Sequence, residues 1–103
     1  IVPWDRRTVF DSVAKTGRLV VVEEAPRSGG WGNEIVAATT SHLFGKLKAA
    51  PFRITTPDIP VPYSGPLETR FIPTKDDVAR QIKEVIETGK TPQTWWEVEG
   101  LRS

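Results

Sequence analysis

The stretch that decides the fold is Arg18 to Ile35, which reads RLVVVEEAPRSGGWGNEI. Leu19 to Val22 is an unbroken run of four apolar residues, three of them β-branched, and such a run is typical of a strand covered on both faces. A glycine-rich turn follows and leads into a helical pattern. This order predicts the strand, turn and helix of a parallel α/β sheet. Because ligands and partners of such sheets meet the carboxyl ends of the strands, the turn Ala25 to Gly32 is the first candidate for function.

Composition limits the classes to which the protein can belong. A chain of 103 residues forms one small domain with a thin core. Fourteen basic residues face thirteen acidic ones, and the longest basic cluster is the pair Arg6-Arg7, so the sequence supports neither a nucleic-acid partner nor a membrane partner. The absence of cysteine excludes disulfides and thiolate metal sites and fits a reducing compartment. No apolar run approaches the roughly 20 residues that span a bilayer, and we expect a soluble protein.

The first half of the chain predicts two helices and two strands. The first helix runs from about Arg6 to Lys15, with Asp5 as its cap and Gly17 as its left-handed stop, and the strand Arg18 to Glu24 follows. The second helix begins near Gly32-Asn33, with Asn33 as a candidate cap, and ends around Lys46. A short strand, Phe52 to Thr55, should then lie beside the first strand, because consecutive parallel strands usually neighbour one another.

The second half predicts an irregular crossing and one further helix. Five prolines lie between Thr56 and Pro73, so we expect irregular structure there, anchored by six apolar residues: Ile59, Val61, Tyr63, Leu67, Phe71 and Ile72. Thr74 opens a helix with a capping-box pattern, and Gly89 ends it. The remaining tail contains Trp95-Trp96, Val98 and Leu101 and is too apolar to stay in water, so it should pack on the domain or on a partner.

The glycine-rich turn allows two interpretations. Gly30 and Gly32 fit the first two glycines of the dinucleotide fingerprint G-x-G-x-x-G, but Ile35 stands at the third, and no P-loop lysine follows. A phosphate site is therefore the weaker interpretation. In the stronger one, the glycines permit a tight turn that brings Trp31 onto a protein surface.

Other polar residues are poor candidates for chemistry. Glu23 and Glu24 are adjacent on a strand and point to opposite faces, so we interpret them as solvated strand-end charges rather than an acid/base pair. Glu34 suits the first turn of a helix without any catalytic role. His42 has no second metal ligand at the right spacing, and no Ser or Thr stands in a nucleophile elbow. We therefore expect no catalytic, cofactor-binding or metal-binding residue in this chain.

Three separated motifs carry a resemblance to a known family: Gly17 to Pro26, Gly29 to Ile35 and Thr56 to Tyr63. They resemble the C-terminal domain of the beta subunit of thiamin-diphosphate-dependent 2-oxo acid dehydrogenases, and the likeness covers about residues 1–89. It implies a transketolase C-terminal-domain-like fold, a three-layer α/β/α sandwich with a mostly parallel sheet. Its first strand would precede Ile1, so we expect the chain to be a piece of a longer polypeptide. Glu23 stands where many relatives have His, and Asn33 stands where Ala is commoner.

The resemblance also implies a function. The parent enzyme would oxidatively decarboxylate a 2-oxo acid of the pyruvate, branched-chain or acetoin type and transfer the acyl group to a lipoyl arm. Thiamin diphosphate and Mg²⁺ would be held by other parts of that enzyme, so the 103-residue piece alone should be inactive. The partners implied are the alpha subunit, a second beta subunit and the peripheral subunit-binding domain of the acyltransferase core. The compartment would be the cytoplasm, or the mitochondrial matrix in a eukaryote.

We therefore predict an assembly and docking domain, residues 1–89, followed by a C-terminal extension, residues 90–103. The predicted interface residues are Arg27, Gly29, Gly30, Trp31 and Tyr63, and Ser28 could reach a neighbour in the same way as Arg27. Two alternatives stay open. One is a small-molecule or phosphate-binding α/β module that uses the turn from Gly29 to Asn33, and the other is the same domain from another transketolase-like enzyme.

Overall fold

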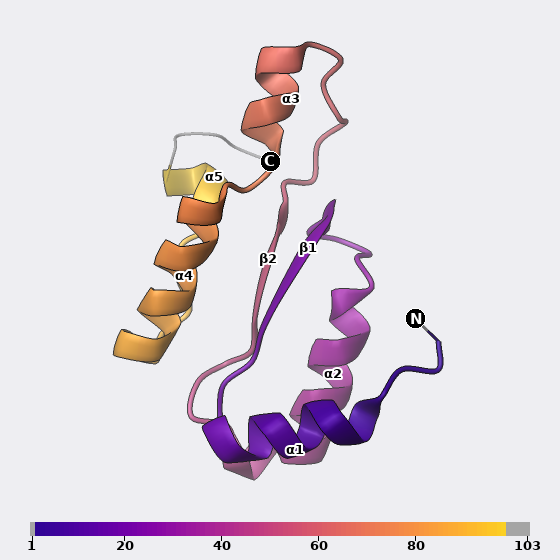
Figure 1. Ribbon diagram of the computed structural model, residues 1–103, viewed down its shortest axis with the longest axis vertical. Helices are drawn as coiled ribbons and strands as arrows, with labels where there is room; N and C mark the ends of the chain where they lie inside the picture. Colours follow the sequence, from indigo (N-terminus) through magenta and orange to yellow (C-terminus); the bar gives the residue numbers. More distant parts are fainter. Residues whose placement is uncertain (1, 99–103) are drawn as a thin grey trace.

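A computed structural model describes residues 2–98 of the protein, and Figure 1 shows two strands lying between two layers of helices. The elements in chain order are α1 (Arg6–Thr16), β1 (Val20–Pro26), α2 (Gly32–Leu43), the 3-10 helix η1 (Phe44–Lys46), β2 (Phe52–Thr56), α3 (Gly65–Phe71), α4 (Lys75–Thr88) and α5 (Trp95–Val98). The predicted α/β class and the parallel pairing of the two strands are confirmed.

The register of the two strands assigns their side chains to the two helical layers. Val20 pairs with Phe52 and Val22 with Ile54, and Val20, Phe52 and Ile54 pack with α4. Successive side chains of a strand point to opposite faces, so Arg53 and its neighbours Val21 and Glu23 on β1 point toward α2. Where Val20, Phe52 and Ile54 pack on α4 the sheet is therefore apolar, whereas the α2 face carries the charges of Glu23 and Arg53.

Val22 departs from the expectation of a strand covered on both faces. Its side chain is 49% exposed although it lies on the apolar face. Within residues 2–98, β1 pairs with β2 along one edge only, so no further strand flanks Val22 on the other side. The strand also begins two residues later than predicted and extends to Pro26.

The core lies between the sheet and the C-terminal elements. It consists of Ala49, Phe52, Ile54, Val85, Trp95 and Trp96, with Val20, Val78 and Ile82 packed against it. Val78, Ile82 and Val85 form the apolar face of α4 toward this core, whereas Ile86 is 57% exposed. The predicted capping box of α4 is present as well: the Asp77 amide donates to Thr74 Oγ1 at 3.1 Å, and the Thr74 amide donates to Asp77 Oδ2 at 2.9 Å.

The two N-terminal helices begin in different ways. Asp5 caps α1 as predicted, because its carboxylate accepts from the Thr8 amide at 3.1 Å, and Gly17 ends the helix with a φ of 71°. The prediction that Asn33 caps α2 is wrong. Asn33 lies inside the first turn, Trp31 occupies the cap position without a side-chain bond, and the helix ends at Leu43 before η1 begins.

The segment from Thr56 to Pro73 is not wholly irregular, because it contains helix α3. Pro66 stands in the first turn of that helix, where a missing amide costs no intrahelical hydrogen bond. The predicted anchors are also mostly wrong. Phe71 is buried and Ile72 is partly buried, whereas Ile59, Val61, Tyr63 and Leu67 are exposed.

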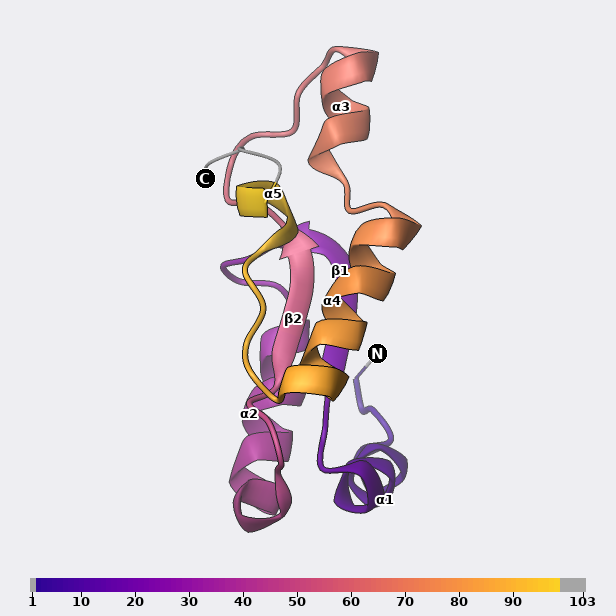
Figure 2. The ribbon, with the colours of Figure 1, turned by 90° about the vertical axis from the view of Figure 1, so that its left-hand side faces the viewer.

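The tail packs back on the domain. Figure 2 shows it running from the end of α4 alongside β2 to α5. Trp95 and Trp96 are 1% and 2% exposed, and the Trp95 indole donates to the carbonyl oxygen of Thr55 at 2.6 Å. Leu101 lies outside the described residues, and the boundary proposed at Gly89 stays a prediction. No helix within residues 2–98 is long and apolar enough to cross a bilayer.

Candidate functional site

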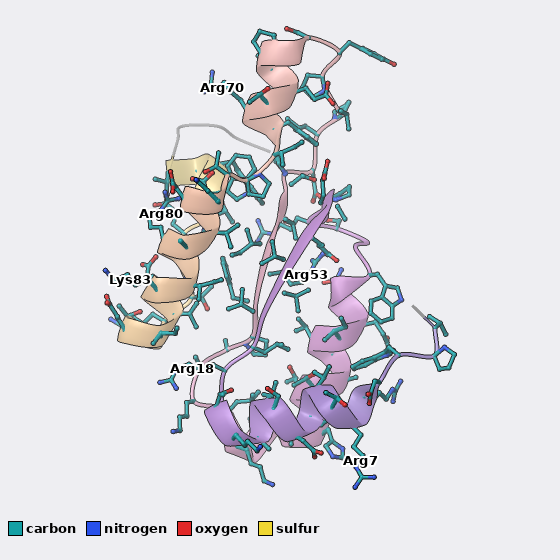
Figure 3. The ribbon with its side chains drawn as sticks, viewed as in Figure 1. Arg7, Arg18, Arg53, Arg70, Arg80 and Lys83 are labelled. Carbon is teal, nitrogen blue, oxygen red and sulfur yellow. The ribbon has the colours of Figure 1, made fainter. Side chains whose placement is uncertain are left out.

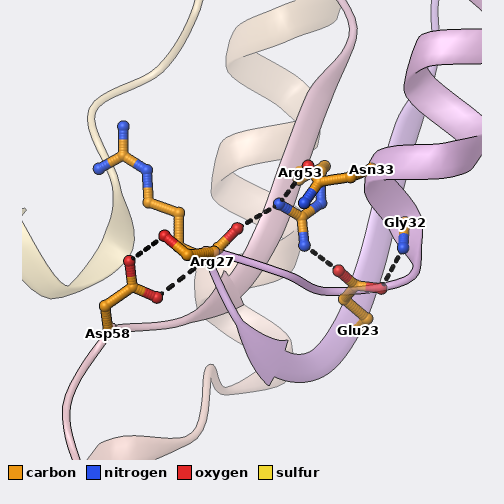
Figure 4. Close-up of polar contacts among 7 residues, drawn as sticks. Glu23, Arg27, Gly32, Asn33, Arg53 and Asp58 are labelled. Carbon is orange, nitrogen blue, oxygen red and sulfur yellow. Dashed lines mark hydrogen bonds and ion pairs between the residues drawn. The ribbon is translucent and has the colours of Figure 1, made fainter.

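The carboxyl end of the sheet is organised around an ion pair between Glu23 on β1 and Arg53 on β2. Arg53 Nη2 contacts Glu23 Oε1, and the two side chains are only 17% (Glu23) and 12% (Arg53) exposed. Arg53 Nη1 also donates to the carbonyl oxygen of Arg27 at 2.6 Å and to Asn33 Oδ1 at 2.8 Å. Figure 4 shows that this one guanidinium joins both strands, the turn between β1 and α2, and α2 itself.

Glycines 30 and 32 let the turn close over the ion pair. A Cβ at Gly30 would lie 2.3 Å from both Arg53 Nη2 and Glu23 Oε1, and a Cβ at Gly32 would lie 2.8 Å from Glu23 Oε2. The Gly32 amide instead donates to Glu23 Oε2 at 2.8 Å. The N-terminus of α2 thus already has an internal carboxylate at the place where a helix would bind an external anion.

Two sets of contacts fix the outer side of the turn to the last residue of β2 and to the segment that follows it. The Arg27 amide donates to the carbonyl oxygen of Thr56 at 3.1 Å. Ser28 donates to Asp58 twice, from its amide at 2.9 Å and from its hydroxyl at 2.6 Å. The Ser28 hydroxyl and then its amide lower the pKa of Asp58 from the ordinary value of 3.8, because both bonds favour the charged carboxylate. The turn is therefore held from both sides.

Beside this turn lies an open pocket of about 730 Å³ with aromatic walls. Trp4 and Trp31 meet edge to face with ring centroids 5.9 Å apart. Arg6 lies 5.4 Å from the Trp4 ring centroid, and its Nη2 lies 3.4 Å from Glu34 Oε1. Gly29, Gly30 and Asn33 line the same pocket. A pocket with two indole walls and a largely exposed ion pair suits an apolar side chain from another protein surface.

The structure brings three of the five predicted interface residues together and leaves two apart. Gly29, Gly30 and Trp31 line the aromatic pocket, whereas Arg27 lines a separate cavity of about 330 Å³ beside β2. Tyr63 is fully exposed and belongs to the segment that leads to α3, which Figure 1 places at the opposite end of the molecule from α1. The five residues therefore do not form one continuous surface.

The remaining candidates take structural positions. The interpretation of Glu23 as a solvated charge is wrong, because Arg53 and the Gly32 amide bind it in a largely buried position, whereas Glu24 is exposed as predicted. Glu34 is exposed and pairs with Arg6. His42 is exposed and stacks on Phe10 with ring centroids 4.4 Å apart. Within residues 2–98, no three metal-ligating side chains lie together.

Sequence reasoning missed Arg53, the residue that holds this site together. Figure 3 shows its side chain lying between the sheet and α2. The signal was present in the sequence, because Arg53 is a single cation within a short strand predicted to lie beside the covered first strand. Once Arg53 is opposite Val21, strand alternation places it on the same face as Glu23. Glu23 and Asn33 are two of its three partners.

Comparisons with known proteins agree on one family. The family described as "Transketolase, C-terminal domain" matches residues 1–78. Among curated relatives, the chain is 56% identical over 62 residues to "Pyruvate dehydrogenase E1 component subunit beta" of Mycoplasma pneumoniae, which covers 60% of this chain and 19% of that protein. The mitochondrial protein of the same name from Ascaris suum is 44% identical over 85 residues, 82% of this chain and 24% of the relative.

A third relative carries a different name. "Acetoin:2,6-dichlorophenolindophenol oxidoreductase subunit beta" of Cupriavidus necator is 39% identical over 88 residues, 85% of this chain and 26% of that protein. The chain thus spans about a fifth to a quarter of the length of these relatives. With the parallel strands and the matched residues, these likenesses show that the chain belongs to the transketolase C-terminal domain family, in the form found in beta subunits of 2-oxo acid dehydrogenases.

Proposed function

We propose that this chain is a non-catalytic assembly and docking domain of a 2-oxo acid dehydrogenase beta subunit. The parent enzyme would oxidatively decarboxylate a 2-oxo acid of the pyruvate, branched-chain or acetoin type and acylate a lipoyl group. The names of the relatives support this proposal, because they describe beta subunits of enzymes with several components. The compartment would be the cytoplasm, or the mitochondrial matrix if the source is eukaryotic.

The occupied N-terminus of α2 is the observation that carries this proposal. The Glu23 carboxylate accepts a hydrogen bond from the Gly32 amide, and Gly30 and Gly32 have no room for even one added carbon atom. Binding a phosphate at this turn would bring a second anion beside a largely buried carboxylate, and like charges repel at short range. The turn instead offers Trp31 and the aromatic pocket to a partner. A phosphate-binding module, the alternative function, is therefore disfavoured.

The described residues also fit the parent's cofactor poorly. Thiamin diphosphate with Mg²⁺ needs amides or cations for its phosphate oxygens and oxygen ligands for the metal. Residues 2–98 provide no cluster of three metal-ligating side chains, and the most suitable helix N-terminus carries Glu23. We therefore assign the cofactor to other parts of the parent enzyme. This domain would contribute contacts to the alpha subunit, the second beta subunit and the acyltransferase's peripheral subunit-binding domain.

Replacing Trp31 with alanine tests the assembly role. Aromatic side chains at the centre of interfaces commonly contribute about 2 kcal/mol or more to binding, which corresponds to about a 30-fold change in Kd. Trp31→Ala in the full polypeptide is therefore expected to weaken association with the alpha subunit by about that factor, measured by analytical ultracentrifugation. Circular dichroism should show an unchanged fold, since Trp31 lies outside the buried core.

If Trp31→Ala disturbs the turn, Tyr63→Ala provides an independent test of subunit association. Tyr63 is fully exposed, so its removal cannot destabilise the domain through lost packing. It should weaken association with one of the partner subunits by about tenfold. If neither variant changes any subunit contact, the assembly role assigned to these residues is wrong. Tight binding of thiamin diphosphate to the domain alone, measured by calorimetry, would also contradict the proposal.

A further inference from the structure

The fold gathers five basic side chains that are far apart in the sequence at one end of the molecule. Two structural contacts bring their segments together. The Lys48 amide donates to the carbonyl oxygen of Gly17 at 2.8 Å, and a Cβ on Gly89 would lie 3.9 Å from the Lys48 carbonyl oxygen. The end of α1, the loop after η1 and the end of α4 therefore meet. The basic residues of these segments are Lys15, Arg18, Lys46, Lys48 and Lys90, named here the basic end.

The charges of the basic end are not neutralised within the described chain. None of its five side chains has a carboxylate within 4.0 Å among residues 2–98, and all but Arg18 are exposed. Nearby carboxylates have other partners: Asp11 lies 4.0 Å from Arg7, and Glu87 lies 3.8 Å from Lys83. Figure 3 places Arg18 and Arg7 at opposite ends of α1. The charge is therefore local, although the whole chain has a net charge of only +1.

An apolar groove opens within the basic end. It has a volume of about 470 Å³, and its walls include Phe44, Leu47, Ala50 and Pro51, with Lys48 at its side. Phe44 is 79% exposed, which is unusual for a large aromatic ring. The groove is large enough for one or two apolar side chains, and it lies at the opposite end of the strands from the turn that carries Trp31.

We propose that the basic end binds an acidic protein segment that places an aromatic or aliphatic side chain against Phe44. This inference rests on the proposed docking role of the domain and specifies the chemistry of one partner. Charge complementarity argues for carboxylates, because Lys48 lines the groove and none of the five cations of the basic end has an ion pair within residues 2–98. The groove argues for a protein segment rather than a nucleic acid or a lipid surface, because only a peptide offers carboxylates and compact apolar side chains at alternate positions.

Fluorescence anisotropy with a labelled 12-residue peptide of alternating Glu, Leu and Phe tests the proposal on the full polypeptide. A peptide with Lys in place of Glu, and one with Ser in place of Leu and Phe, separate the charge and apolar contributions. The acidic apolar peptide should bind at least tenfold more tightly than either, and more weakly as the salt concentration rises. Lys46→Glu with Lys48→Glu should weaken its binding by at least tenfold, and Phe44→Ala should do so as well. A matched charge change outside the basic end, Arg70→Glu with Lys75→Glu, should leave binding unchanged.

Three outcomes would overturn the inference. One is equal binding of the three peptides, and another is binding that survives the Lys46 and Lys48 changes. The third is tighter binding of a 12-nucleotide single-stranded DNA or of phosphatidylserine vesicles, which would identify another class of partner. Subunit association of Trp31→Ala is measured in parallel. If that association is lost while the acidic peptide fails to bind, the assembly role stands and this inference falls. If the peptide binds while neither Trp31→Ala nor Tyr63→Ala changes subunit association, this inference stands and the assembly role assigned to those residues falls.

Discussion

At the scale of single residues, the glycine-rich turn packs closely over the Glu23 carboxylate and the Arg53 guanidinium. Motifs with this spacing invite an interpretation as phosphate sites, because glycine amides can approach an anion closely. Here the anion is Glu23, two residues beyond the pairing position Val21. Gly29 has a positive φ of 79° and open space around it, whereas Gly30 faces the ion pair directly. Gly29 is thus required for its backbone conformation, and Gly30 is required because a side chain there would overlap the ion pair.

Gly30→Ala should destabilise the domain by about 1–3 kcal/mol, because the added Cβ would overlap the ion pair and force it or the turn to move. Urea denaturation followed by circular dichroism measures this change. Gly45→Ala is the matched control, since a Cβ there meets no atom within 4 Å and its φ is not in the left-handed region. Equal stability of the two variants would show that the turn adapts without strain.

At the scale of elements, the tail completes the core and covers the outer edge of β2. The Phe52 amide donates to the carbonyl oxygen of Leu19, so the backbone groups of the even-numbered residues of β2 point toward β1. The backbone groups of Arg53 and Thr55 therefore point away from β1, toward the outer edge of β2. The Trp95 indole satisfies the outward carbonyl of Thr55, and Trp96 packs in the same cluster. Edge strands with open backbone groups invite pairing with other chains. The short helix α5 therefore acts as a cover for this edge.

Trp95→Phe and Trp96→Phe form a matched pair that isolates this contact. Both side chains are almost fully buried, and both variants remove a similar apolar area. Only Trp95→Phe also leaves the Thr55 carbonyl without its donor, so it should be less stable than Trp96→Phe by about 1–3 kcal/mol. Thermal or urea unfolding gives the difference. A smaller loss for Trp95→Phe than for Trp96→Phe would contradict the role of the indole donor.

At the scale of the whole molecule, the two faces of the sheet are stabilised by different physics. The α4 face is a continuous apolar cluster, whereas the α2 face depends on Arg53 and Glu23 for its central contact. A largely buried ion pair contributes little net stability when intact, but removal of one partner leaves an unpaired charge. The α2 layer is therefore coupled to the sheet through the guanidinium of Arg53.

Arg53→Met alone should lower the free energy of unfolding by about 3–5 kcal/mol, because it leaves Glu23 charged and largely buried. The double variant Arg53→Met with Glu23→Gln should recover most of that loss. Lys83→Met, in a pair whose side chains are 74% and 60% exposed, should change stability by less than about 1 kcal/mol. Additive losses in the double variant would mean that Glu23 and Arg53 act independently.

The sequence by itself determined the local features of this protein. Asp5, Gly17, Thr74 and Gly89 fix the bounds of α1 and α4 because caps act within one helical turn. The apolar run Leu19 to Val22 and the short strand that begins at Phe52 were enough to predict that two parallel strands pair. Helix α3 was missed because prolines between 57 and 73 argue against helix, although Pro66 in a first turn does not.

Only the tertiary structure decided which distant residues meet. Glu23 and Arg53 are 30 positions apart, and their contact follows from strand register, which no local pattern specifies. The basic end likewise joins segments around positions 17, 48 and 89 that carry no run of charge in the sequence. The physical reason is the same in both cases: propensity and capping act over a few neighbouring residues, whereas burial and charge depend on which segments the whole chain packs together.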